Sequence, residues 1–360
     1  MQALHLLALD PVSETTADGN SYGFRKGRAA RDALAQCFIV LARRSRPEWV
    51  LEADIKGCFD NISHDWMLRH IPMDRQVLRK WLKVGFMDKA QWFPTEAGTP
   101  QGGIASPTLA NMGLDGLEDR LSRRFSRRIG GKKLKVRLIR YADDFVITGA
   151  TQETLEQVKA EVIAFLADRG LSLSPEKTKI THVSEGFDFL GFNVRTYSGK
   201  LLITPSKDAL VRVSRKVRDI IRGNKTARQQ RVIGLLNPVV RGWANYHRHV
   251  VSKRTFSKLD ELIWNALWRW ATPRHPNKGR RWVKKKYFHA LGSRFWVFAC
   301  DNGKENWRGK PELMRLVKAQ DIKIRRHVKV KADANPYDPQ WKNYFAGYGG
   351  PVVTGSDQDL

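Results

Sequence analysis

Apolar runs of strand length alternate with longer stretches of helical periodicity in the first half of the chain. The runs of strand length lie at residues 49–55, 136–141, 145–148 and 171–181, with a tight turn between the second and the third. Two stretches with apolar residues at helical spacing, 106–121 and 151–169, lie between them. The order strand, helix, strand, strand, helix, strand predicts a split βαβ arrangement, and therefore an α+β fold.

Three aspartates lie where predicted strands end. Asp54 ends the first strand, and Asp143 and Asp144 form the turn between the second and the third. The first and third strands are the central pair of a split βαβ sheet, so these aspartates become neighbours although almost ninety residues separate them. A carboxylate at the end of a buried strand is costly unless its charge is compensated, and three can hold two Mg²⁺ ions about 4 Å apart. A polar hairpin turn is the alternative, because Asp is favoured in turns.

The second half of the chain carries three apolar stripes at helical spacing. They lie within residues 210–220, 232–243 and 256–270. These stripes predict three helices packed on one another rather than platforms for base stacking, and basic residues oppose the first stripe. A cluster of aromatic and basic residues suited to structured RNA is expected to be exposed near the second stripe: Arg241, Tyr246, His247, Arg248 and His249.

Charge is distributed unevenly along the chain. The net charge is +28 and the isoelectric point about 10.3, which is typical of a protein that binds nucleic acid. Residues 1–200 carry a net charge of +6 and residues 201–360 one of +22. The second half is therefore expected to hold most of the RNA affinity, with a strong dependence on salt. The stretch 120–140 holds ten basic residues and no acidic one, and we expect it to contact a nucleic acid backbone.

Cysteine content and hydropathy bear on location. Cys37, Cys58 and Cys300 are scattered without metal-ligand spacing, as suits a reducing cytosol. No signal peptide and no apolar run of membrane-spanning length is visible. The sequence predicts a cytoplasmic protein without a membrane partner.

Motifs of one enzyme family occur along the chain in that family's order. Residues 21–28, 54–60, 98–103, 141–144, 170–177 and 189–192 resemble successive motifs of reverse transcriptases. Residues 236–246 resemble the maturase domain of bacterial group II intron proteins. The chain therefore resembles bacterial group II intron-encoded reverse transcriptase/maturases over nearly its whole length. Relative to that pattern we expect it to be shortened at its N-terminal fingers and to lack the HNH endonuclease.

The resemblance implies roles for single residues. Asp54, Asp143 and Asp144 would be the catalytic ligands of two Mg²⁺ ions. Phe59 would exclude a ribose 2′-hydroxyl, although its spacing alone favours a core residue. Lys177 would lie near the triphosphate, although a solvated loop lysine is the commoner case. The remaining assignments are Gln101 for nucleotide binding, Leu190 and Gly191 for the primer grip, and Arg25 and Arg28, with Arg241, Tyr246, His247 and Arg248, for RNA binding.

The resemblance also implies a right-hand polymerase. The expected parts are partial fingers (1–35), a palm with the split βαβ core (36–200), a helical thumb or maturase domain (201–290), and a basic C-terminal segment (291–360), a remnant of a DNA-binding region. The expected function is RNA-directed DNA synthesis from dNTPs, with an RNA template and a DNA primer, coupled to binding and splicing of a group II intron RNA. A non-catalytic RNA-binding maturase and a reverse transcriptase of a defence or diversity-generating system are the alternatives, and monomer or homodimer is left open.

Overall fold

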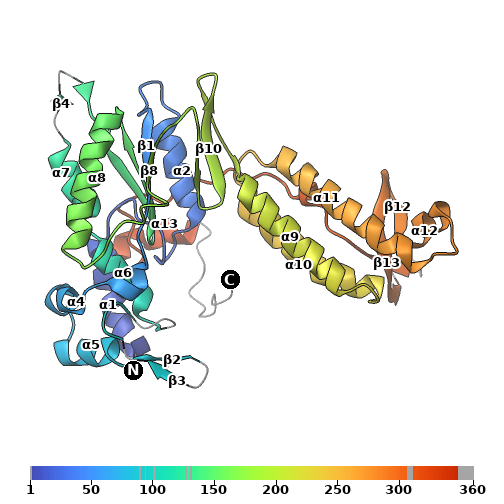
Figure 1. The fold of residues 1–360 in the computed structure, drawn as a ribbon, viewed down its shortest axis with the longest axis horizontal. Coiled ribbons are helices and arrows are strands. Elements are labelled where there is room, and N and C mark those ends of the chain that lie inside the picture. The colour runs from blue at the N-terminus through green and yellow to red at the C-terminus, as the bar shows by residue number, and fades with distance from the viewer. Residues whose placement is uncertain are drawn as a thin grey trace. The chain divides into compact units, whose positions relative to one another are not determined.

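The chain forms two compact units, which we describe separately. The computed structural model describes residues 2–88, 91–93, 95–99, 103–126, 128–129, 132–305 and 311–347. The first unit comprises Met1–Leu190, Arg195–Leu201 and His327–Leu360, and the second comprises Gly191–Val194 and Leu202–Arg326. Figure 1 labels their helices and strands.

A four-stranded antiparallel sheet of order β6-β7-β1-β8 forms the centre of the first unit (Figure 1). Its strands are β1 (Trp49–Asp54), β6 (Arg137–Tyr141), β7 (Asp144–Gly149) and β8 (Lys179–His182). As predicted, the central pair is formed by β1 and β7, which are the first and third strands of this sheet in chain order. The predicted α+β class and split βαβ order are therefore confirmed.

Helices cover this sheet through the apolar stripes of the sequence. Helix α8 (Gln152–Ala167) contacts β1 and β7 and buries Leu155, Val158 and Val162. Helices α2 (Ala30–Leu41) and α7 (Leu117–Arg124) contact β6. The remaining elements of this part of the chain are α1 (Gln2–Thr16), α3 (Cys58–Asn61), α4 (His64–His70), α5 (Arg75–Leu82), α6 (Ser106–Leu114) and the two-stranded sheets β2 (Phe86–Asp88) with β3 (Gln91–Phe93) and β4 (Arg128–Ile129) with β5 (Lys132–Lys133).

The helix expected over 106–121 is two helices, α6 and α7. Asp115 is extended and Gly116 has a φ of 91°, a left-handed conformation that glycine adopts readily, so the first helix ends here. The carboxylate of Asp18 accepts hydrogen bonds from the backbone N–H of Gly116 (3.0 Å) and Glu118 (3.3 Å). A distant side chain therefore stabilises the start of the second helix, which periodicity could not reveal.

The strand expected over 171–181 is shorter than predicted. Only Lys179–His182 pairs with β1 as a strand, and Leu173 makes an isolated bridge to Ile55. The backbone N–H of Lys177 donates to the carbonyl of Ser174 across a turn (3.2 Å). Pro175 within that turn has no N–H to donate to a ladder, and the paired strand begins only after it.

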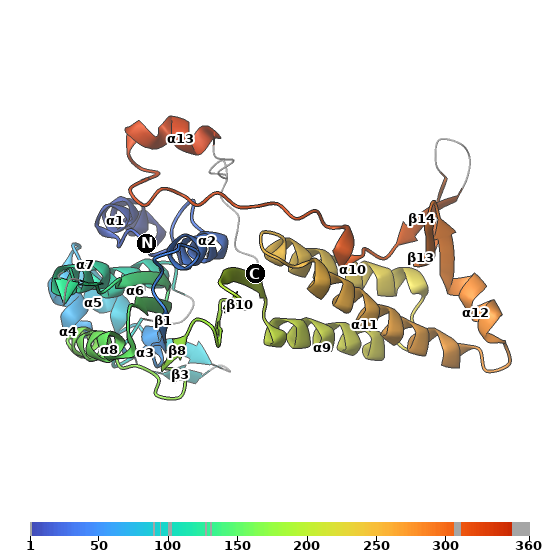
Figure 2. The same ribbon diagram turned by 90° about the horizontal axis from the view of Figure 1, so that it is seen from above.

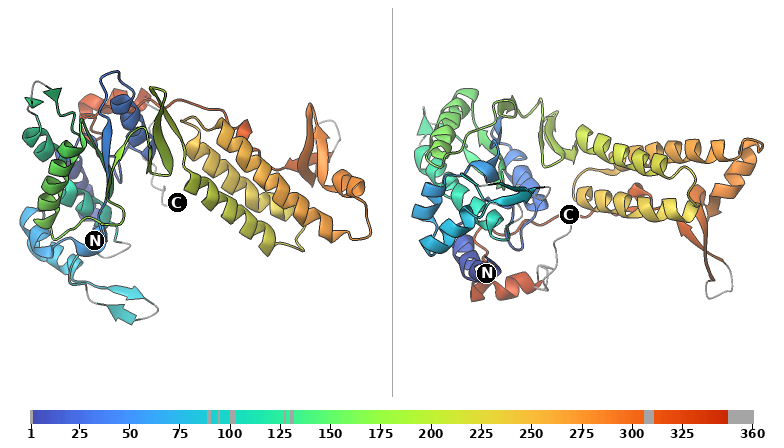
Figure 3. Two further views of the ribbon diagram at one scale, coloured as in Figure 1. Left: turned by 45° about the horizontal axis from the view of Figure 1, so that its top comes forward. Right: turned by 60° about the horizontal axis from the view of Figure 1, so that its bottom comes forward.

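Three long helices form most of the second unit, in agreement with the three apolar stripes. They are α9 (Lys207–Gly223), α10 (Gln229–His247) and α11 (Lys253–Ala271), and they lie side by side (Figure 3). A three-stranded sheet, β12 (Phe288–Leu291), β13 (Arg294–Glu305) and β14 (Pro311–Arg315), follows helix α12 (Arg280–Tyr287). The rings of Trp264, Trp268, Phe288 and Trp296 pack within 6.1 Å of one another, so these aromatic residues belong to the packing of the unit.

The segment 291–360, expected to be a single basic segment, is shared between the two units. Its first part, up to Arg326, belongs to the second unit, and the part from His327 belongs to the first. There His327 Nε2 lies 2.7 Å from Oδ1 of Asp32, and the backbone N–H of Val330 donates to the same oxygen (2.9 Å). Helix α13 (Lys342–Gly347) lies in this returning part (Figure 2).

A second three-stranded sheet, of order β11-β10-β9, follows the central sheet in the chain. It is formed by β9 (Phe187–Phe189), β10 (Phe192–Tyr197) and β11 (Lys200–Pro205). Within the described residues, no helix combines the length and apolar character needed to cross a bilayer.

Candidate active site

The three predicted aspartates meet at one end of the central strand pair. Asp54, the last residue of β1, lies opposite Asp144, the first residue of β7, in the antiparallel register. Tyr141 also pairs with Asp144, so Ala142 and Asp143 form the connection between β6 and β7. Ala142 has a φ of 56°, a left-handed conformation that is strained for a residue with a Cβ atom. The fold therefore brings together carboxylates that are far apart in the sequence.

Burial and mutual repulsion raise the pKa of two of these carboxyl groups. The pKa of Asp144 rises to about 6, first because of burial, then because of the charges of Asp143 and Asp54 and a hydrogen bond shared with Asp54. Burial also raises the pKa of Asp143, with a contribution from Asp54. Carboxyl groups that resist ionisation in this way favour a nearby cation.

Lys177 supplies a positive charge to the cluster. Its Nζ lies 2.7 Å from Oδ2 of Asp54, and this hydrogen bond raises the pKa of the lysine. The side chain of Lys177 is 68% exposed, so it is held by the carboxylate rather than by packing.

The donor chemistry of the cluster suits a hard divalent cation, because such ions prefer carboxylate oxygens. The side chains of the described residues include no group of three or more His, Cys, Asp or Glu that is already arranged as a metal site. One oxygen of Asp54 contacts Lys177 instead. The carboxylate oxygens of the cluster and the raised pKa values of Asp143 and Asp144 therefore suit a divalent cation by their chemistry, and not by the present positions of the side chains.

A buried arginine lies directly behind the Ala142–Asp143 connection. Arg140 is 1% exposed, and its guanidinium donates to the carboxylate of Asp115, to Oδ1 of Asn111 (3.2 Å) and to the carbonyl of Ala142 (3.5 Å). Asp18 lies 4.0 Å from the same guanidinium. Arg140 thus links the carbonyl of the connection to the break between α6 and α7. Sequence reasoning missed this role, although an arginine inside an apolar strand was a signal for it.

The segment before α2 is paired with β6 next to the cluster. The N–H of Tyr22 donates to the carbonyl of Arg140 (2.9 Å), and the N–H of Arg140 donates to the carbonyl of Asn20 (2.9 Å). A Cβ atom on Gly23 would lie 2.4 Å from the backbone nitrogen of Ala142. Glycine is therefore required at position 23 for this backbone to approach the connection.

The predicted nucleotide-binding residues are only partly defined by the structure. Phe59 is half-buried, packs on the core of the first unit and lies edge-on to Phe24 with ring centroids 6.0 Å apart. A Cβ atom on Gly98 would lie 2.2 Å from the carbonyl oxygen of Phe59, so the start of the motif at 98–103 lies on the Phe59 backbone. Gln101 itself lies outside the described residues.

The predicted primer-grip residues form the turn between β9 and β10. Leu190 has a φ of 51° and Gly191 one of 79°. The carbonyl of Gly191 accepts a hydrogen bond from the N–H of Ser206 (2.9 Å). The turn therefore has a fixed backbone conformation that glycine allows at its second position.

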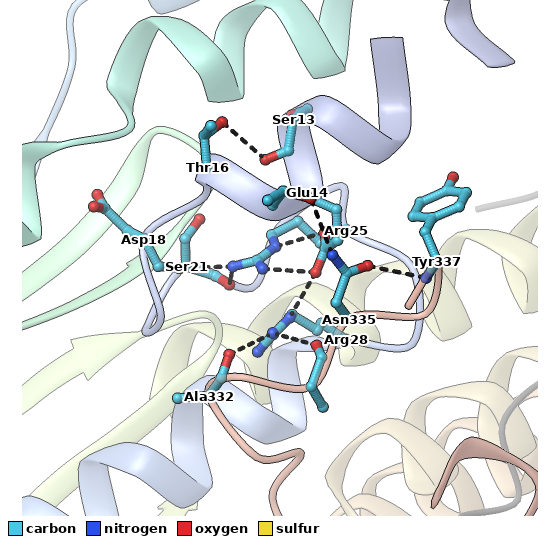
Figure 4. Close-up of polar contacts among 12 residues, drawn as sticks. Ser13, Glu14, Thr16, Asp18, Ser21, Arg25, Arg28, Ala332, Asn335 and Tyr337 are labelled. Atoms are coloured by element: carbon cyan, nitrogen blue, oxygen red, sulfur yellow. Dashed lines mark hydrogen bonds and ion pairs between the residues drawn. The ribbon is translucent and has the colours of Figure 1, made fainter. Parts of the chain in front are cut away.

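Arg25 and Arg28 are structural in this fold, which corrects the expectation that they contact RNA. Arg25 donates to both carboxylate oxygens of Glu14 (2.6 and 2.9 Å), and Arg28 lies 3.5 Å from the same group (Figure 4). The side chain of Arg28 is 1% exposed and also donates to the carbonyl of Ala332 (2.9 Å). Both guanidinium groups are thus shielded from a phosphate.

The cluster expected to be exposed on the second predicted thumb helix is exposed in part. Arg241 and Tyr246 are exposed on α10 and Arg248 is half-buried just after it. His247 is only 2% exposed, and its ring packs on Phe192 and Trp243. Burial lowers the pKa of His247 to about 3, with a smaller effect from the charge of His249. The expectation that His247 faces RNA is therefore wrong, because its side chain fills the helix interface.

The basic stretch 120–140 is also divided by the fold. Arg120 lies 2.5 Å from Glu161, to which Arg124 is also paired, and Arg123 pairs with Asp119. Arg140 is buried on Asp115. The expected continuous backbone-binding run therefore includes arginines whose charge is already balanced by carboxylates outside the stretch.

The order of the sheet and the carboxylates on β1 and β7 place the first unit in the class of right-hand polymerases. Residues 1–194 match the family of reverse transcriptases (RNA-dependent DNA polymerases), and residues 210–288 match the group II intron maturase-specific domain. The chain therefore belongs to the reverse transcriptase family, and its second half resembles the maturase-specific domain of group II introns. The resemblance found in the sequence motifs is thereby confirmed.

Similar proteins include intron-encoded relatives. Group II intron-encoded protein LtrA of Lactococcus lactis subsp. cremoris is 28% identical over 331 residues, covering 67% of this chain and 55% of that protein. Protein YkfC of Escherichia coli (strain K12) is 30% identical over 227 residues, covering 53% of this chain and 59% of that protein. The structure of apo telomerase from Candida tropicalis has a TM-score of 0.44 at 13% identity, covering 79% of this chain and 52% of that chain. The chain spans about half the length of the curated relatives it matches.

Proposed function

We propose that the chain is an RNA-directed DNA polymerase that extends a DNA primer with dNTPs on an RNA template. The observation that carries this proposal is the meeting of Asp54, Asp143 and Asp144 at one end of β1 and β7. The raised pKa values of Asp143 and Asp144 indicate a site that favours cations. The resemblance to the family supports a division into fingers (1–35), palm (36–200), thumb (201–290) and C-terminal segment (291–360).

The three aspartates would hold two Mg²⁺ ions. When bound, such ions supply the charge that activates a primer 3′-hydroxyl and stabilises the leaving pyrophosphate. Lys177, at 2.7 Å from Asp54, would supply a further positive charge or a proton to the triphosphate. Arg140 would keep the Ala142–Asp143 connection in place through its bond to the carbonyl of Ala142.

Selection and positioning would fall to three further features. Phe59 would exclude the 2′-hydroxyl of an incoming ribonucleotide, and Gln101 would bind the nucleotide. The Leu190–Gly191 turn would hold the primer end, because its backbone conformation is fixed and glycine permits a close approach.

We further propose that the chain binds a group II intron RNA and assists its splicing. The maturase-specific domain at 210–288 and the net charge of +22 in residues 201–360 support this part. On α9, Arg212, Arg215 and Lys216 are exposed opposite the buried Val213 and Val217. The second candidate function is that of an RNA-binding maturase whose palm does not catalyse polymerisation. The basic face of α9 favours this candidate, because RNA binding there does not require the aspartates.

One pair of assays separates the two candidates. Purified chain is incubated with Mg²⁺, dNTPs and a DNA primer annealed to an RNA template, and binding of the intron RNA is measured in parallel. Primer extension by the wild type but not by an Asp143→Asn variant supports the polymerase. Tight binding of the intron RNA by the wild type without primer extension would support the non-catalytic maturase and not the polymerase.

A further inference from the structure

A hollow on the first unit lies apart from the aspartate cluster. Its volume is about 600 Å³, and it is lined by the end of α2 and the loop after it, by the end of α7, and by residues 133–137 before and at the start of β6. Arg137 begins β6, whereas the Ala142–Asp143 connection follows its last residue, Tyr141. At about 3.3 Å per residue, the length of this strand places the hollow roughly 15 Å from the connection.

The lining of this hollow is basic. Its cationic side chains are Arg43, Lys133, Lys135 and Arg137, and no Asp or Glu lines it among the described residues. Within the described part of the chain, no salt bridge joins Arg43, Lys133 or Arg137 to a carboxylate. Nζ of Lys135 donates to the carbonyl of Arg46, which leaves its charge without an anionic partner there. The hollow therefore collects positive charge that the fold itself does not balance.

The cations of the hollow differ from the neighbouring arginines in having no carboxylate partner among the described residues. Arg120, Arg123 and Arg124, in the same basic stretch, are each paired with a carboxylate. Arg43 comes from a different segment, about ninety residues earlier in the chain, and the fold brings it to the same hollow as Lys133 and Arg137. Unbalanced cations from separate segments around one concave surface are expected where a polyanion binds.

The lining of the hollow favours a nucleic acid strand over a small anion as its ligand. Apolar side chains, including the exposed Ile39 together with Val40 and Leu134, line the hollow beside the cations. A single phosphate would need donors that converge on one point, whereas cations contributed by separate segments of the lining match successive phosphates of a backbone. The apolar part can accept the sugar or base between them.

We propose that this groove, lined by Arg43, Lys133, Lys135 and Arg137, binds the phosphodiester backbone of RNA, and that it is an attachment site separate from the polymerase centre. The inference rests on the proposed function, because it assumes that the chain binds RNA. It assigns to the polymerase-like unit a share of RNA affinity that the charge of the second half alone would not provide.

The test uses a charge-reversed groove in the full chain, Arg43→Glu/Lys133→Glu/Arg137→Glu. The matched control is Arg79→Glu/Lys80→Glu/Lys83→Glu, which makes the same charge change at exposed residues of α5 and just after it in the same unit. Binding of a structured intron RNA is measured at several salt concentrations, with a DNA duplex of similar length as a second ligand. Thermal melting establishes that both variants fold.

For RNA binding by the groove variant, we expect the slope of log K against log salt to be smaller in magnitude by about 2 to 3 than for the wild type. The loss of three phosphate contacts requires a change of this size. The control should keep the wild-type slope. An equal loss in both variants, an unchanged slope in the groove variant, or an equal loss for DNA and RNA would each overturn the proposal. Absence of RNA binding by the wild type would instead remove the proposed function.

Discussion

Nζ of Lys177 lies 2.7 Å from Oδ2 of Asp54, although 123 positions separate the two residues. The contact joins the end of β1 to the turn that replaces the first part of the expected fourth strand. The same aspartate lies opposite Asp144 across the β1–β7 ladder. Asp54 is therefore the residue through which the lysine and the carboxyl group of Asp144 are connected.

Replacing Lys177 should affect chemistry more than RNA binding. We expect Lys177→Met to lower the rate of dNTP incorporation about 100-fold, because a positive charge or proton donor near the triphosphate is lost. Lys177→Arg should recover part of the rate by restoring the charge. Single-turnover primer extension measures both variants, and equal rates for methionine and wild type would show a solvated lysine without a role.

Replacing Asp143 should remove primer extension and spare RNA binding. Asp143→Asn keeps the size of the side chain and removes a charged oxygen ligand, so we expect extension to fall by at least about 10²-fold. Affinity for intron RNA should stay within a few-fold of wild type. Asp119→Asn, at an exposed surface position, is the control. Normal extension by Asp143→Asn would exclude this residue from the catalytic centre.

Two outcomes distinguish the roles of Phe59. Phe59→Ala should raise the ratio of rNTP to dNTP incorporation if the ring excludes a 2′-hydroxyl. The half-buried ring also packs on the core, so we expect a loss of about 2 kcal/mol in the free energy of unfolding, less than for a fully buried phenylalanine. Chemical denaturation and incorporation of each nucleotide measure the two effects separately. Destabilisation with an unchanged ratio would assign Phe59 to the core alone.

The parts of this fold that depend on local pattern could be predicted from the sequence. Apolar runs of strand length and apolar stripes at helical spacing located the sheet, α8 and the three long helices, because burial of strands and of one helix face requires those patterns. The meeting of Asp54 and Asp144 followed from strand order. Local pattern could not reveal the break at Gly116, since the carboxylate of Asp18, about 100 positions away, caps the second helix.

The errors at candidate RNA-binding residues have one physical cause. A charged or aromatic residue in a sequence does not reveal whether a partner from a distant segment will cover it. Arg28 is covered by Glu14 and Ala332, and His247 by Phe192 and Trp243. The contact between His327 and Asp32 spans 295 positions, so the return of the C-terminal segment to the first unit was equally hidden.

Removing Arg140 should destabilise the first unit strongly. Arg140→Met leaves the buried Asp115 and Asp18 without their cation, and we expect a loss of about 3–5 kcal/mol in the free energy of unfolding. The double variant Arg140→Met/Asp115→Leu should recover part of this loss, because the uncompensated charge is removed as well. Urea denaturation of the single and double variants measures the coupling. A double variant less stable than Arg140→Met would show that charge compensation is not the reason.

The buried His247 should make the second unit sensitive to acid. Its pKa falls from 6.5 to about 3 in the folded chain, mainly through burial, so the unfolded chain binds one more proton at pH 5. The contribution of His247 to the free energy of unfolding is therefore fully present above pH 6.5 and falls as the pH drops toward 3. At pH 5 the loss is ~2 kcal/mol. His247→Leu should remove this part of the loss between pH 7 and pH 5 in urea denaturation, whereas His70→Gln, at an exposed position, should not. An identical loss in wild type and His247→Leu would show that His247 does not contribute to the acid sensitivity.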